Sequence, residues 1–88
     1  MKNYIDELKK KILYRSNYRG TKEMDMLLGS FVNSIIEKLE KDKLENLLDF
    51  LDLDDENLLK IKQGKETNLK IKDKFILELF KNFDLKKI

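Results

Sequence analysis

The sequence predicts an all-α fold, a compact five-helix bundle that spans residues 1–88 as a single domain. Apolar residues recur at three- and four-residue intervals along most of the chain, which is the spacing of one buried helix face. Strand signals are scarce, with one Val, two Thr and no Asn-Gly or Asp-Gly pair. A chain of 88 residues that is 41% apolar and 41% charged has the material for one small core.

The first two helices are expected over residues 3–15 and 21–40. Asn3 is the expected cap of the first, and Gly20 or Thr21 of the second. The intervening residues 16–21 are rich in Ser, Asn and Gly, which favour turns and helix ends. The second helix has the broadest apolar stripe, which comprises Met24, Leu27, Leu28, Phe31, Val32, Ile35, Ile36 and Leu39.

The third helix is expected to start at Asp42, because Asp42 and Glu45 have the spacing of a capping box. Asp54 or Asp55 is expected to cap a short fourth helix, which Gly64 ends. The last element is expected to open at 67–68 and to continue as a helix with three phenylalanines in the core, Phe75, Phe80 and Phe83.

The composition argues against an enzyme. The chain has no Cys and no His, so disulfides, thiolate nucleophiles, imidazole bases and the commonest metal ligands are excluded. The acidic run 52–56 lacks the glycine and the late glutamate of a calcium loop, so helix capping on a solvated turn explains it better. No metal, catalytic or cofactor-binding residue is therefore predicted.

Charge divides the chain into three segments. Residues 1–22 and 60–88 each carry a net charge of +5, whereas residues 23–59 carry −8. The basic ends can lie against the acidic middle, which argues against nucleic acid as a partner. The longest uncharged run, residues 26–36, is too short to cross a bilayer, and the first residues lack an apolar signal region. We expect a bacterial cytoplasmic protein that is monomeric when free.

Two arginines, Arg15 and Arg19, stand beside Gly20 in a chain whose other basic residues are all lysines. A guanidinium grips carboxylates and phosphates through a planar fork that Lys does not have. Recognition of a partner and an internal salt bridge from Arg19 to Glu23 are both compatible with this pattern. Glu23 and Asp25 lie where the first turn of a helix favours acids.

The outer face of the second helix is expected to expose Met26, Gly29, Ser30 and Asn33. Uncharged faces that contain Met are typical of partner surfaces, although a crossing helix of the same domain would also explain the small residues. We interpret this face, with Tyr18 at the same end, as a partner-binding surface.

The stretch 15–31 resembles the SdhE family, the flavinylation factors of succinate dehydrogenase. Family members have an Arg-Gly pair, two variable residues, Glu, one residue, Asp and an apolar run that leads to Phe. Arg19, Gly20, Glu23, Asp25 and Phe31 occupy those positions. The chain departs from many members at two positions, with Tyr18 in place of Arg and Ile61 in place of Trp.

The resemblance implies a non-enzymatic assembly factor. Such a protein binds the flavoprotein subunit of succinate dehydrogenase, or that of fumarate reductase, and promotes covalent attachment of FAD, which is the partner's cofactor. The expected partner-binding residues are Arg15, Tyr18, Arg19, Gly20, Glu23, Asp25, Met26 and Gly29. Gly20 would allow close approach, Glu23 would orient Arg19 or contact the partner, and Asp25 would brace the helix start.

Two other functions remain open from the residues alone. The first is a small nucleic-acid-binding or regulatory module that uses the basic N-terminal helix and the Lys-rich tail. The second is a helical adaptor of the antitoxin type, which would share the uncharged surface but would not need the Arg19–Glu23 arrangement.

Overall fold

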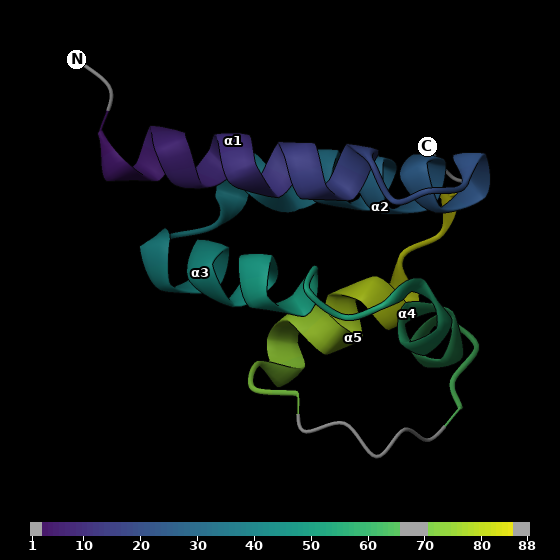
Figure 1. Ribbon diagram of the computed structural model, residues 1–88. Helices are drawn as coiled ribbons and strands as arrows, with labels where there is room; N and C mark the ends of the chain where they lie inside the picture. Colours follow the sequence, from purple (N-terminus) through teal and green to yellow (C-terminus); the bar gives the residue numbers. More distant parts are fainter. Residues whose placement is uncertain (1–2, 66–70, 86–88) are drawn as a thin grey trace.

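The computed structural model describes residues 3–65 and 71–85. It contains α1 (Tyr4–Asn17), α2 (Lys22–Ile35), a short 3-10 helix η1 (Ile36–Lys38), α3 (Lys41–Phe50), α4 (Asp55–Lys62) and α5 (Lys74–Asn82). All regular elements in these two ranges are helical, which confirms the predicted all-α bundle of five α-helices. Figure 1 shows α1 and α2 as an antiparallel pair lying above α3, α5 and α4.

Side-chain caps fix most helix starts. Asn3 Oδ1 accepts from the backbone N–H of Asp6 at 2.9 Å, Thr21 Oγ1 accepts from Met24 at 3.2 Å, and Asp54 Oδ1 accepts from Asn57 at 2.9 Å. These caps satisfy donors that the first helical turn leaves unpaired. Gly64 follows α4 with φ +76°, as expected of a residue that ends a helix. The caps predicted for α1, α2 and α4 are therefore confirmed.

The predicted bounds of α1 and α2 are wrong in opposite directions. α1 continues through Ser16 and Asn17, whose side chains both donate to the Leu13 carbonyl within the helix. α2 stops at Ile35, after which the chain tightens into η1 and becomes extended at Leu39. This change redirects the backbone into α3 and still buries Ile36.

The predicted capping box at Asp42 is also wrong. α3 begins at Lys41, so Asp42 already lies in its first turn. Glu40 precedes the helix, and among the described residues no side chain caps this end. The last helix begins later, at Lys74, with Asp73 as its cap. The expected opening at 67–68 lies outside the described residues.

The core contains residues of all five α-helices, and its phenylalanine rings meet edge to face. Phe31 of α2 meets Phe80 of α5 with ring centroids 5.1 Å apart, and Phe50 of α3 meets Phe80 at 5.5 Å. Phe83 lies 5.6 Å from Phe31 and is half-buried. Phe75, however, is 50% exposed, with the Lys43 ammonium 4.8 Å from its ring centroid. Its predicted place in the core is wrong, because α5 turns Ile76 inward instead.

Within the described ranges, every helix is too short or too polar to cross a bilayer. The same residues contain no group of three or more acidic side chains placed to hold a metal ion.

Candidate docking surface at the α1–α2 turn

Residues 18–21 connect α1 and α2 at one end of the molecule (Figure 1). Gly20 adopts φ +113°, which L side chains rarely tolerate. A Cβ at this position would meet no described atom within 4 Å, so the backbone conformation, rather than lack of space, favours glycine here. The turn therefore presents a bare and exposed stretch of backbone.

Arg19 points away from solvent and into the loop between α3 and α4. Its Nε donates to Asp55 Oδ1 at 3.0 Å, its Nη1 to the Leu51 carbonyl at 2.6 Å, and its Nη2 to the Leu53 carbonyl at 2.7 Å. The Arg19 side chain is only 11% exposed. The expected pairing of Arg19 with Glu23 is therefore wrong, because Asp55 and two loop carbonyls occupy the guanidinium.

The end of α3 explains why the loop accepts a cation. The last carbonyls of a helix lack intrahelical partners and give its C-terminal end a partial negative charge, which favours a cation nearby. The last turn of α3 has apolar and acidic side chains and supplies no cation of its own. Arg19, 32 and 34 residues away in sequence from the two carbonyls, supplies that charge.

Asp25 holds the same turn from the other side. Its Oδ1 accepts the backbone N–H of Arg19. Since Asp25 lies in the first turn of α2, this contact ties the turn to the helix that follows. Arg19 is thus anchored by its side chain to the α3–α4 loop and to Asp55, and by its backbone to α2.

Arg15 makes a weaker contact with the same loop. It forms an ion pair with Asp52, and the two side chains are 46% and 58% exposed. Ion pairs that remain this exposed to solvent contribute little to stability. Arg15 therefore keeps donors available at the surface, unlike Arg19.

The exposed neighbours of the turn mix charge with apolar groups. Tyr18 is 71% exposed and stacks on Tyr14 with ring centroids 4.7 Å apart. Met26 is 55% exposed, and Glu23 is exposed in the first turn of α2. We use the name turn surface for the exposed members of this region, which are Arg15, Tyr18, Gly20, Glu23 and Met26.

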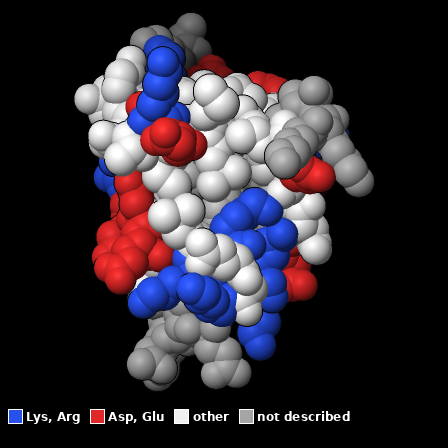
Figure 2. Space-filling view, turned by 90° about the vertical axis from the view of Figure 1, so that its right-hand side faces the viewer, with Lys and Arg blue, Asp and Glu red and all other residues white. Residues whose placement is uncertain are grey.

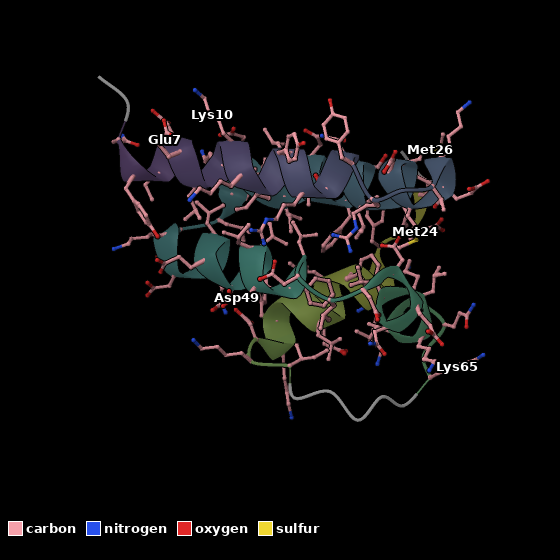
Figure 3. All side chains as sticks on the ribbon, in the orientation of Figure 1. Glu7, Lys10, Met24, Met26, Asp49 and Lys65 are labelled. Carbon is pink, nitrogen blue, oxygen red and sulfur yellow. The ribbon has the colours of Figure 1, made fainter. Side chains whose placement is uncertain are left out.

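Figure 2 looks onto this end of the molecule and shows uncharged atoms across the middle of the face, with basic and acidic side chains around them. In Figure 3, Met26 lies at the turn end of α2, whereas Glu7 lies at the far end of α1. An uncharged centre with polar and charged residues around it is the composition of many protein interfaces.

Gly29 does not belong to the turn surface. It is buried, and a Cβ built there would lie 2.5 Å from Asn17 Oδ1 of α1. Its predicted exposed position is wrong, because the small residue accommodates a neighbouring helix of the same chain. Met26 and Asn33 do lie outward as expected, and Ser30 is half-buried.

The sequence interpretation missed Asp52 and Asp55 as partners of the two arginines. It assigned the acidic run 52–56 to capping, which is correct for Asp54 alone. The distribution of charge along the chain did indicate contacts of this kind, because the basic ends were expected to lie against the acidic middle. Arg15–Asp52, Arg19–Asp55 and Lys9–Glu37 are contacts of that kind.

Comparison with known proteins places this turn within a recognised family. The family model described as flavinator of succinate dehydrogenase matches residues 10–84. The chain is also 48% identical over 42 residues to a protein of Dictyostelium discoideum named succinate dehydrogenase assembly factor 2, mitochondrial. That alignment covers 48% of this chain and 30% of the relative. No solved structure matches. Since the family match includes the turn surface and every helix from the middle of α1 onward, the chain belongs to the flavinator of succinate dehydrogenase family.

Proposed function

We propose that this chain binds the flavoprotein subunit of succinate dehydrogenase and promotes covalent attachment of FAD to it. The observation that carries the proposal is the turn surface, where an exposed glycine backbone is held rigidly between α2 and the α3–α4 loop. Family membership supplies the class of partner. In this proposal the turn surface is where that partner docks.

The turn surface has the components of a compact docking site. Tyr18 and Met26 offer large apolar contacts, and the Tyr14–Tyr18 stack restricts the ring that would be buried. Arg15 and Glu23 provide charges of opposite sign for orienting a partner. The open Gly20 backbone allows another main chain to approach without a side chain between them.

In this proposal Arg19 has a different part from the one that its sequence position suggests. Its guanidinium is enclosed by its own chain, so it fixes the turn instead of reaching the partner. FAD remains the partner's cofactor, and the flavin and its acceptor protein supply the bond-forming chemistry. The chain acts by binding and orienting.

The test mixes apo flavoprotein subunit and FAD with and without this chain, and measures flavin fluorescence on a denaturing gel. Wild-type chain should raise the rate of attachment. Glu23→Ala should reduce that stimulation at least about tenfold if Glu23 contributes a central contact.

Glu7→Ala is the matched control, because Glu7 is likewise an exposed acid near a helix start but lies at the opposite end of α1 (Figure 3). It should stimulate attachment as wild type does. An attachment rate that does not respond to wild-type chain, with no complex on gel filtration, would remove the proposal.

A further inference from the structure

Asp55 is the acid that receives the enclosed guanidinium of Arg19. It is the first residue of α4 and its side chain is 29% exposed. It therefore lies on a different element from the turn surface, 36 residues along the chain from Arg19. Asp54, immediately before it, is occupied in capping α4.

The contacts of Arg19 make one rigid connection between two loops. The guanidinium fork spans Asp55 and the carbonyls of Leu51 and Leu53, so its plane is set by three acceptors at once. Its backbone N–H is fixed by Asp25. A shift of the α3–α4 loop would therefore move the residue that immediately precedes Gly20.

Without Asp55 the fork would retain only neutral carbonyl acceptors. Charge-assisted hydrogen bonds are about twice as strong as neutral ones, so the remaining contacts would hold the side chain less firmly. The turn would keep its fold, because Asp25 and the Thr21 cap act independently of α4. It would, however, sample more positions of Gly20 before a partner arrives.

We infer that Asp55 is a positioning residue for docking, which acts through Arg19 to hold the Gly20 turn in its binding geometry. This inference rests on the proposed function. Asp55 itself need not touch the partner. Its contribution is to reduce the ordering that binding requires, which strengthens association without changing the chemistry that follows.

A purely structural role for Asp55 is the alternative. An acid in the first turn of α4 favours the helix through its dipole whether or not Arg19 is present. Glu56 is the matched residue for this effect, since it also lies in the first turn of α4. Glu56 forms an ion pair with Lys60 at 3.7 Å, within α4 itself.

The experiment compares Asp55→Ala with Glu56→Ala in the attachment assay at increasing concentrations of the full chain. Asp55→Ala should raise the concentration for half-maximal stimulation about tenfold, while the rate at saturation stays at the wild-type value. Glu56→Ala should leave both quantities unchanged. A merely structural residue would not produce this division between binding and rate.

The position of the turn is measured independently from the amide signals of Arg19 and Gly20 in NMR spectra. Asp55→Ala should shift both signals and speed hydrogen exchange at the Arg19 amide, and Glu56→Ala should not. Asp55→Asn keeps the size of the side chain and one acceptor oxygen, so it serves if Asp55→Ala folds poorly. It should give the same shifts and weaker binding.

The outcomes separate the inference from the proposed function. If wild type stimulates attachment and Glu23→Ala weakens it, but Asp55→Ala and Asp55→Asn bind as wild type, the positioning role is wrong and the proposed function stands. If wild type itself neither binds nor stimulates, the proposed function fails first. Equal effects of Asp55→Ala and Glu56→Ala would assign both acids to helix stability and would also overturn the inference.

Discussion

Two largely enclosed charges of opposite sign hold loops in this molecule. Near the α1–α2 turn, the Arg19 cation is surrounded by Asp55 and backbone carbonyls. At the start of α5, the Asp73 anion accepts from Lys43 at 2.9 Å and from Asn46 at 2.7 Å. Asp73 also caps the helix through backbone N–H groups of α5.

The two sites differ in whether the central charge can be neutralised by a change of pH. A guanidinium stays protonated at every accessible pH, so the charge at the centre of the Arg19 contacts is permanent. A carboxylate can be neutralised by protonation. The molecule therefore has a permanent charge at the centre of the contacts beside its proposed docking surface, and a charge that acid can remove where α5 begins.

The largest effect is expected from Arg19→Ala. This change leaves Asp55 and the carbonyls of Leu51 and Leu53 without their donor, so the free energy of unfolding should fall by about 3 kcal/mol. The melting temperature should drop by roughly 15 °C. Thermal unfolding followed by circular dichroism measures it. An unchanged melting temperature would show that the enclosed guanidinium contributes nothing to the fold.

This result would also correct an expectation that the sequence suggests. A motif arginine that recognises a partner should be removable without cost to the fold. The enclosed side chain predicts the opposite for Arg19 and retains that expectation for exposed Glu23.

An intermediate effect is expected from acid at Asp73. Burial disfavours the charged carboxylate, but hydrogen bonds from Lys43, Asn46 and the N–H groups of Ile76 and Phe75 outweigh it and lower the pKa of Asp73. A lowered folded-state pKa means that this stabilisation is complete above the ordinary value of about 3.9. It is lost as the pH falls below that value through the lowered pKa.

Denaturant titrations between about pH 6 and about pH 2, the range over which carboxylates titrate, measure this dependence. Asp73→Asn should have a lower free energy of unfolding than wild type at about pH 6. The two free energies should converge as the pH falls and the wild-type carboxylate becomes protonated. A difference between the two proteins that stays constant with pH would contradict the assigned role of the charge.

The smallest effect is expected from Arg15→Ala. Because Arg15 and Asp52 are both largely exposed, the loss in unfolding free energy should be about 0.5 kcal/mol or less. Chemical denaturation measures it beside Arg19→Ala. Equal losses for the two arginines would show that burial and the added carbonyl contacts do not distinguish them.

Local patterns predicted much of this fold. Asn3, Thr21 and Asp54 act as caps because a cap needs only a side chain and an amide three residues later. The position of Gly64 just after α4 was predicted from the same kind of short-range geometry. The early end of α2 did not follow, since the apolar stripe continues through η1 although the backbone changes.

The site was less predictable than the fold. Spacing placed Glu23 within reach of Arg19, but the three acceptors at 3.0 Å or less lie more than 30 residues away. Such a partner depends on how α3 and α4 pack, which local periodicity does not contain. Gly29 shows the same limit, because its neighbour Asn17 belongs to another helix.

The proposed function depends on docking of the flavoprotein subunit at the turn surface. The most direct measurement titrates apo flavoprotein subunit into the isotopically labelled chain and follows each backbone amide by NMR. Docking at the turn surface predicts that Tyr18, Gly20, Glu23 and Met26 lose or shift their signals first, while Tyr4, Glu7 and Asp73 keep theirs. Changes centred on the second group, with the α1–α2 turn unaffected, would contradict it.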